Sequence, residues 1–189
     1  MTRSRSRRYV GALVCAITLA GAPAAAQAAE PERPSTTARL QDRSVEKSRA
    51  AAASERVVTP GERVRAGAGV ELWLTEEGKH WSTPEVEHQF RSVVDGNIDL
   101  HTPSIGMTAE TVGDRYFLSG IHVTGHPSVR VVVRTSDGEV TASVVRLPGR
   151  PGWGVWYTDV ALHENLTIDR VTLQHESGRE IASLTPSRP

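Results

Sequence analysis

Cysteine is almost absent from this 189-residue chain, in which Cys15 is the only one. Cys15 lies within the first 28 residues, a segment that we expect to be removed from the mature protein. The mature chain would then contain no thiol. This excludes disulfide bonds, a cysteine nucleophile and a thiolate metal site, so the fold has to be stabilised by a buried core.

The chain also lacks a long hydrophobic run. Its most apolar N-terminal segment covers about 13 residues, from Val10 to Ala22, whereas a membrane-spanning helix needs about 20. Four arginines between residues 3 and 8 precede this segment, and the small-residue pattern Ala26-Gln27-Ala28 follows it. The pattern predicts a secretory signal peptide over residues 1–28 that is cleaved after Ala28, and a secreted, extracellular mature protein without a membrane span. An uncleaved anchor is the alternative.

Positive charge becomes scarce once this leader is removed. The whole chain has 22 basic and 22 acidic residues, and the leader contains four of the basic residues and none of the acidic ones. The mature chain therefore has a net charge near −4. Proteins that bind nucleic acid or anionic membranes need clustered lysine and arginine, so the sequence predicts no nucleic-acid partner.

Large apolar side chains are rare between residues 29 and 60. This segment is rich in Pro, Ser, Ala, Arg and Glu, and it cannot bury enough apolar surface to offset the entropy lost on ordering. It is predicted to be a disordered or marginally helical tether, with a docked helix as the alternative. Residues 61–189 contain eight of the nine aromatic residues and are predicted to form one domain.

The periodicity of the domain favours β-strands. Short β-branched runs alternate with Gly, Pro, Asp and Asn, and this predicts an all-β fold, a single β-sandwich of immunoglobulin-like or jelly-roll-like type. Hairpins are expected around Asp137-Gly138 and Ser177-Gly178. Further strands are expected over residues 70–75, 98–101, 107–112, 116–123 and 153–158. After Val144 the alternation slips, which indicates a bulge or a strand covered on both faces.

The most distinctive stretch is Gly152-Trp153-Gly154-Val155-Trp156-Tyr157. In a strand, Trp153 and Tyr157 share one face and Trp156 lies on the other. One face has to be core, and the other presents an indole to a second packed element or to solvent. A solvent-facing indole is a platform for a sugar ring or a peptide. The predicted ligand-binding residues are Trp153, Trp156, Tyr157, Trp73 and Trp81, with burial in the core as the alternative.

Three segments together resemble small exported proteins of actinobacteria that have no assigned function. These are the Trp-rich strand, the strand Tyr116-Phe117-Leu118-Ser119-Gly120 and the Asp137-Gly138 hairpin. The resemblance covers residues 111–185. It implies export and a sandwich fold, and it brings no catalytic residue with it.

Motifs with a defined chemistry are missing. The segment from Asp95 to Asp99 begins like a calcium loop but lacks the required glycine and glutamate, and a turn is the simpler interpretation. His122 and His126 have the spacing of a helical zinc motif, but they lie across a strand end. There is no G-x-S-x-G motif, and a triad drawn from distant residues such as His163 and Asp159 is not detectable in one sequence. No cofactor, metal site or catalytic residue is predicted.

Two hypotheses about function follow. The first is a secreted, non-catalytic binding or interaction module at the cell envelope or outside the cell, with a cell-wall glycan or another exported protein as its partner. The second is a small secreted hydrolase or inhibitor whose active residues come from loops. A polar cleft that joins His, Asp and Ser would favour the enzyme, and a row of solvent-facing indoles would favour binding.

Overall fold

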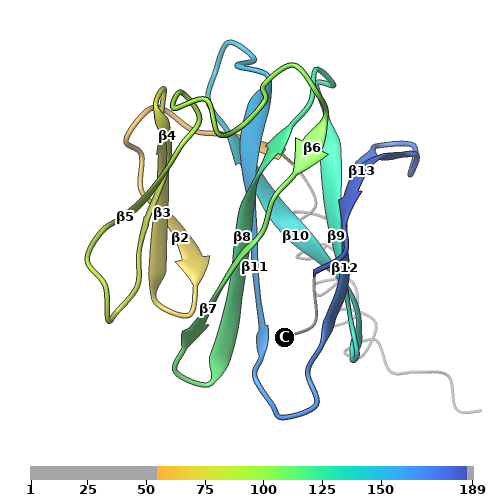
Figure 1. The fold of residues 1–189 in the computed structure, drawn as a ribbon. Coiled ribbons are helices and arrows are strands. Elements are labelled where there is room, and N and C mark those ends of the chain that lie inside the picture. The colour runs from red at the N-terminus through yellow and green to blue at the C-terminus, as the bar shows by residue number, and fades with distance from the viewer. Residues whose placement is uncertain (1–54, 187–189) are drawn as a thin grey trace, which may run out of the picture. The chain divides into compact units, whose positions relative to one another are not determined.

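The computed structural model describes residues 55–186, which contain thirteen β-strands and no helix (Figure 1). The predicted signal peptide, its cleavage site and most of the predicted tether lie outside these residues. The larger sheet consists of β1 (Glu55–Val57), β6 (Ser104–Ile105), β7 (Thr108–Val112), β8 (Arg115–Val123), β9 (Val129–Thr135), β10 (Gly138–Arg146), β11 (Trp153–Ala161), β12 (Ile168–His175) and β13 (Glu180–Leu184). The smaller sheet consists of β2 (Val64–Gly67), β3 (Val70–Thr75), β4 (Gly78–Ser82) and β5 (Gln89–Ser92).

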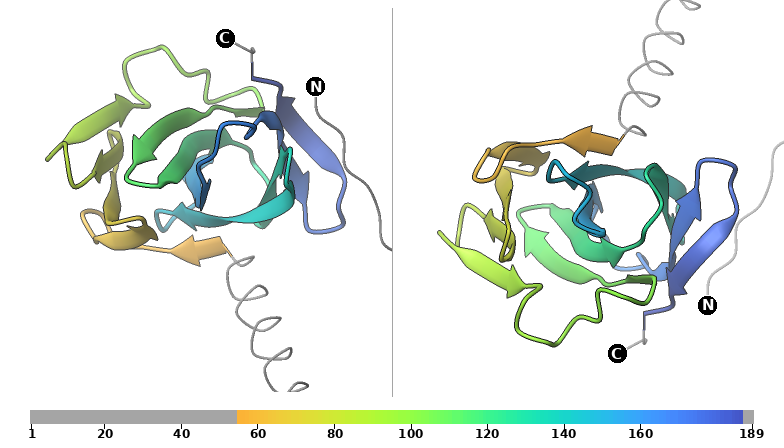
Figure 2. Two further views of the ribbon diagram at one scale, coloured as in Figure 1. Left: turned by 90° about the horizontal axis from the view of Figure 1, so that it is seen from below. Right: turned by 90° about the horizontal axis from the view of Figure 1, so that it is seen from above.

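Two packed sheets confirm the predicted all-β sandwich. The smaller sheet has the order β2-β3-β4-β5, and the main path of the larger sheet is β13-β12-β9-β10-β11-β8-β6. The larger sheet curls so strongly that β6, at one end of this path, lies beside β12 and β13 at the other. Seen along the strands it forms a nearly closed ring with the smaller sheet on its outside (Figure 2).

This curled architecture produces two separate hydrophobic cores. The inner core fills the ring and includes Leu118, Val131, Val144, Trp156 and Leu173. The inter-sheet core lies between the ring and the smaller sheet, and it consists of Val58, Val64, Ala66, Val70, Leu72, Leu74, Trp81, Val93, Val112, Phe117, Ile121, Val123, Val145, Leu147, Trp153 and Val155. Strands β8, β10 and β11 contribute to both cores, so their two faces are both apolar.

The doubly covered strands explain the slip in the pattern of β10. Val144 belongs to the inner core and Val145 to the inter-sheet core. The slip is therefore the signature of a strand buried on both faces, which was one of its two predicted causes. Trp153 and Trp156 follow the same rule on β11, since Trp153 faces the smaller sheet and Trp156 faces the interior of the ring.

Both predicted hairpins are present, with one change of register. Thr135 pairs with Gly138, so the two loop residues of the first hairpin are Ser136 and Asp137, one position earlier than expected. Gly138 instead begins the return strand with a φ of 124°, a conformation that favours glycine. The second hairpin joins β12 to β13 through Ser177-Gly178, as predicted.

Other predictions about the strands need correction. The segment 98–101 forms bends in the connection between β5 and β6, where Ile98 and Leu100 pack against the inter-sheet core and Asp99 and His101 are exposed. The boundary after Pro60 is too late, since Glu55–Val57 pair with β10 in parallel and Val58 is buried. Strand β2 alternates but has only four residues, and β4 and β5 are short, rich in polar residues and without a clear alternation. Residues 55–186 contain no apolar helix of the length that a bilayer requires.

Candidate functional site

The tryptophans predicted to bind a ligand are mostly buried. Trp81 and Trp153 are each 5% exposed, and Trp156 is not exposed at all. The indole of Trp156 donates a hydrogen bond to the carbonyl of Gly106 at 2.9 Å inside the ring. These three indoles belong to the two cores, which was the alternative for the predicted platform. Only Trp73 and Tyr157 remain partly exposed.

Trp73 lies on the outer face of the smaller sheet, in a group that we call the outer aromatic row: Trp73, His80, His88 and Phe90. Trp73 pairs with His80 across β3 and β4, and His80 pairs with Phe90 across β4 and β5. The rings stack nearly parallel, with centroids 5.4 Å apart for Trp73 and His80 and 4.5 Å apart for His80 and Phe90. His88 stacks against both Trp73 and His80.

This stacking covers the indole of Trp73, whereas Phe90 is 45% exposed. The guanidinium of Arg63 lies 3.3 Å from the centre of the Trp73 ring, and two imidazoles cover the indole as well. A sugar platform needs an aromatic face that is open to solvent. The outer aromatic row therefore does not offer the indole platform that the sequence suggested.

The inward face of β4 carries an unexpected cation. Lys79 is only 1% exposed and lies between the two sheets. Its Nζ donates a hydrogen bond to the hydroxyl of Ser119 on β8 at 2.7 Å, and it lies 3.9 Å from the centre of the Trp81 ring. Among the described residues no carboxylate lies within ion-pair distance of this amine. A buried ammonium without a paired anion is unfavourable, so the neutral form is favoured.

The environment of Lys79 changes its protonation. The pKa of Lys79 is lowered to about 7, chiefly by burial; the charge of Glu110 opposes this shift, and the charge of Arg91 adds to it. The amine is therefore divided between its neutral and charged forms near neutral pH. A strongly shifted pKa in a partly enclosed site is a physical marker of function, although structural networks produce it as well.

Glu110 organises the other polar groups between the sheets. Its carboxylate accepts a hydrogen bond from the indole of Trp81 at 2.6 Å and another from the side-chain amide of Gln89 at 2.9 Å. Together with Lys79 and Ser119, these residues form what we call the inter-sheet polar cluster. It joins β4 and β5 of the smaller sheet to β7 and β8 of the larger one.

A pocket of about 540 Å³ adjoins this cluster. It lies between β4 and β5 on one side and β6 and β8 on the other, and the connection from β5 to β6 completes its wall. Its lining consists of Lys79, Arg91, Asn97, Ile98, Asp99, Thr102, Ser104, Ile105, Gly106, Met107, Thr108, Gly120 and Ile121. This volume is within the usual range for small-molecule sites, and apolar walls with a few polar groups are typical of them.

The charges of this inter-sheet pocket favour an anion. Lys79 and Arg91 contribute two cationic groups, and Asp99 contributes one carboxylate. Asp99 is already engaged, since its Oδ1 accepts the backbone N–H of His101 at 2.9 Å, and hydrogen bonds from Thr102 and His101 lower its pKa. Within residues 55–186 no carboxylate forms an ion pair with Arg91. Both cations can therefore accept an external acidic group.

Lys79 and Ser119 also have the spacing of a serine–lysine hydrolase pair. A neutral lysine can take the proton of a serine hydroxyl that then attacks an acyl group. However, Ser119 is 0% exposed and lies in the middle of β8, between β7 and β11. Unlike Lys79, Ser119 does not line the neighbouring pocket, so its hydroxyl is not open to a substrate there.

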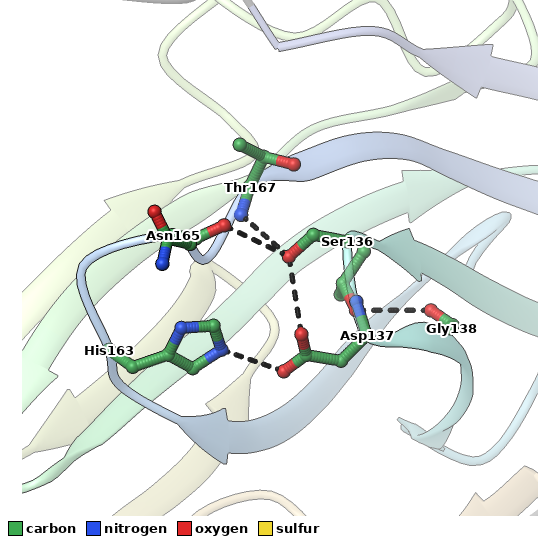
Figure 3. Close-up of polar contacts among 7 residues, drawn as sticks. Ser136, Asp137, Gly138, His163, Asn165 and Thr167 are labelled. Carbon is green, nitrogen blue, oxygen red and sulfur yellow. Dashed lines mark hydrogen bonds and ion pairs between the residues drawn. The ribbon is translucent and has the colours of Figure 1, made fainter.

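A second group of Ser, Asp and His side chains meets at the loop ends of the larger sheet (Figure 3). Asp137 Oδ2 lies 2.8 Å from His163 Nε2. Its Oδ1 accepts a long hydrogen bond from the Ser136 hydroxyl at 3.4 Å. The carboxylate thus stands between the serine and the histidine, whereas a catalytic triad requires the imidazole in that place. Ser136 also bonds the backbone of Asn165 and Thr167, so the group ties two loops together.

The structure does not bring together the other catalytic or metal-binding residues considered from the sequence. Asp159, the carboxylate considered beside His163, instead forms a salt bridge with Arg115. His122 is buried at the end of the ring interior and has no hydrogen-bond partner on either nitrogen, whereas His126 is exposed. Burial lowers the pKa of His122 to about 4.

The segment that begins like a calcium loop forms an ordinary turn, in which Asp95 accepts both the backbone and the side-chain N–H of Asn97.

Sequence reasoning missed Lys79, Ser119 and Glu110. The segment Gly78-Lys79-His80 is polar, so it does not indicate a strand. The available signal was weak: Lys79 and Trp81 are two residues apart, and in a strand they share one face. A tryptophan on the core face then places the lysine there too.

The comparisons add no relatives: no family model matches the chain, and no curated protein or solved structure is significantly similar to it. The function of this chain therefore has to be inferred from its own side chains.

Proposed function

We propose that this protein is a secreted, non-catalytic binding module and that its ligand occupies the inter-sheet pocket. The ligand is a small molecule with one acidic group and an apolar or sugar-like body. The observation that carries this proposal is Lys79, a buried amine without a paired carboxylate that lines the pocket beside the free guanidinium of Arg91. An acidic ligand would supply the direct ion pair that the described residues do not provide.

A cell-wall fragment is the partner class that combines this chemistry with the proposed extracellular location. Muramic acid carries a carboxylate on a sugar when its lactyl group is not linked to a peptide, whereas glucosamine carries none. The Ile98, Ile105 and Ile121 side chains of the pocket offer apolar contact for the body of such a ligand. The competing outcome is binding to another exported protein. In that case the pocket would not need to discriminate between muramic acid and glucosamine.

The pair N-acetylmuramic acid and N-acetylglucosamine tests the proposal, because the two differ by the lactyl carboxylate. We expect saturable binding of the acid and none of the neutral sugar, measured by calorimetry and by the fluorescence of Trp81 beneath the amine. Lys79→Met should abolish this binding. Arg130→Met, which removes an exposed cation outside the pocket, is the matched control and should bind as the wild type does.

Proton linkage gives a second and independent readout. An anion beside Lys79 stabilises the ammonium, so binding takes up a proton wherever the free amine is neutral. With a pKa of about 7 in the free protein, the affinity should be about tenfold weaker at pH 8 than at pH 6. Equal affinity for the acid and the neutral sugar, or unchanged binding by Lys79→Met, would overturn the proposal.

A hydrolase with its active residues on strands, in place of the loop-borne residues suggested by the sequence, would depend on the contact between Lys79 and Ser119. This hypothesis predicts that the wild-type protein turns over an activated ester such as p-nitrophenyl acetate and that Ser119→Ala does not. We expect no difference between the two proteins, because the Ser119 hydroxyl is buried. A burst of product that disappears in Ser119→Ala would instead favour the enzyme.

A further inference from the structure

The two histidines of the outer aromatic row face each other through their ring nitrogens. His80 Nδ1 and His88 Nε2 are 3.0 Å apart, and the rings are nearly parallel at 12°. His80 is on β4, and His88 directly precedes β5. Stacking against Trp73 holds both imidazoles in place from the side of β3.

Thr75 determines which nitrogen of His80 is available. Its Oγ1 lies 2.9 Å from His80 Nε2. With the hydroxyl oxygen as acceptor, Nε2 carries the proton and Nδ1 directs its lone pair toward His88. A hydrogen bond to the outer nitrogen is the usual support for a metal-binding imidazole, because it fixes both the tautomer and the ring orientation.

The spacing of the two nitrogens matches a metal site as well as a hydrogen bond. At a metal–nitrogen distance of about 2.0–2.1 Å, two cis ligands of a square-planar ion are separated by about 2.8–3.0 Å. The 3.0 Å contact of the metal-free chain is at the upper end of this range. His88 is exposed, and its ring has to turn for its Nε2 lone pair to point at an ion shared with His80.

We propose that His80 and His88 form a surface site for a divalent transition metal that prefers nitrogen ligands, with Cu²⁺ bound most tightly. Among the described residues no group of three or more His, Asp or Glu side chains is arranged to hold an ion. The site therefore has two protein ligands, and water completes the coordination. The order of preference follows the general affinity series, in which Cu²⁺ exceeds Ni²⁺ and Zn²⁺. This site is independent of the pocket and of the proposed function.

Trp73 is a built-in reporter for this site. It is the one described tryptophan that is not buried, and its ring lies 5.4 Å and 5.5 Å from the two imidazoles. A paramagnetic ion between them should quench its fluorescence. Titration of the full chain, prepared without a polyhistidine tag, with CuCl₂ should give saturable quenching with one ion per chain. Electron paramagnetic resonance should show coupling to two imidazole nitrogens.

Variants separate this site from general binding of copper to surface histidines. His80→Asn and His88→Asn should each remove the saturable phase, and Thr75→Val should weaken binding about 10–100-fold through the lost outer hydrogen bond. The matched control is the double variant His126→Asn and His175→Asn, which removes the other histidine pair, packed edge to face at 74°. That control should bind copper as the wild type does.

Trp73→Phe distinguishes loss of the reporter from loss of the metal. Phenylalanine keeps an aromatic ring against the two imidazoles, so this variant should lose the quenching of Trp73 while the resonance signal of two nitrogens persists. The proposal is wrong if His88→Asn binds copper as tightly as the wild type. It is equally wrong if the control double variant is the one that loses the site, or if quenching rises linearly without saturation.

Discussion

Lys79 combines a cost in stability with a proposed role in binding. The carbon chain of the lysine is buried favourably, but its charged end lacks a carboxylate partner between the sheets. Replacing such a group by an apolar side chain of similar size often stabilises a protein. A residue that destabilises the fold and lines a pocket is a better candidate for function than one that only fills space.

The stability of the protein should depend on pH through this amine. The pKa of Lys79 is about 7 in the folded protein, whereas the ordinary value of a lysine, which we assign to the unfolded chain, is 10.5. Between these values the unfolded chain keeps a proton that the folded chain has released. The free energy of unfolding therefore rises with pH by up to about 1.4 kcal/mol per unit.

This dependence is isolated by comparing the wild type with Lys79→Met in urea at pH 6, 7, 8 and 9. The difference between the two unfolding free energies should favour Lys79→Met most strongly at pH 6 and shrink as the pH rises. A difference that is constant over this range would show that the amine does not titrate near neutral pH in the folded state.

His122 should make the protein sensitive to acid. Burial lowers its pKa from 6.5 to about 4 in the folded state. As the pH falls below 6.5, the unfolded chain binds a proton that the folded chain does not, so stability is lost progressively down to about pH 4. The free energy of unfolding lost over this range is about 3 kcal/mol. His122→Leu should lose less stability than the wild type between pH 7 and pH 4, whereas the exposed-site variant His126→Asn should follow the wild type.

At the scale of the strands, the most demanding contact is between β8 and the segment that follows β6. A Cβ atom at Gly120 would lie 1.8 Å from the carbonyl oxygen of Gly106 and 2.6 Å from the indole nitrogen of Trp156. Only glycine allows this close approach. The approach in turn positions the carbonyl that accepts the indole hydrogen bond inside the ring.

Gly120→Ala should therefore destabilise the protein by about 2–4 kcal/mol, through steric strain and loss of the hydrogen bond to Trp156. Gly125→Ala is the matched control, because a Cβ there meets nothing within 4 Å. Urea unfolding followed by tryptophan fluorescence measures both variants. Equal stability of the two variants would mean that the ring interior adjusts more easily than the contact distances indicate.

Strands were predictable from the sequence where apolar and polar residues alternate. Strands β9, β10 and β12 have this pattern, and hairpin turns delimit them. Strands β4 and β5 do not, because the inward positions of β4 hold Lys79 and Trp81 while its outward position holds His80. Alternation of hydrophobicity carries no information where the core face holds a charged residue and the outer face an aromatic one.

The candidate site was less predictable than the fold for the same reason. Lys79, Glu110 and Ser119 are spread over about 40 positions and meet only because the two sheets pack together. The predicted tryptophans were misleading, since a strand buried on both faces needs large side chains on each. Which face of a strand is exposed to solvent depends on how the sheets pack, and it cannot be determined from the sequence of one strand.

At the scale of the whole molecule, the proposal of secretion has a direct test. Expression of the full-length chain in a bacterial host with a Sec pathway should release a protein that begins at Ala29, as measured by intact mass. Replacing both Ala26 and Ala28 by phenylalanine should block processing, because signal peptidase accepts small residues at these positions. A full-length protein that stays inside the cell would contradict the proposal.

The first strand of the domain has a consequence for the timing of folding. Strand β1 pairs in parallel with β10, and Glu55 contacts Arg146, which is 91 positions later in the sequence. In a chain that leaves the cell unfolded and N-terminus first, as we propose, β1 emerges long before its partner strand. Contacts so distant in sequence form slowly, because a long loop has to close first. On this proposal, the domain cannot close around its own beginning until most of it has crossed the membrane.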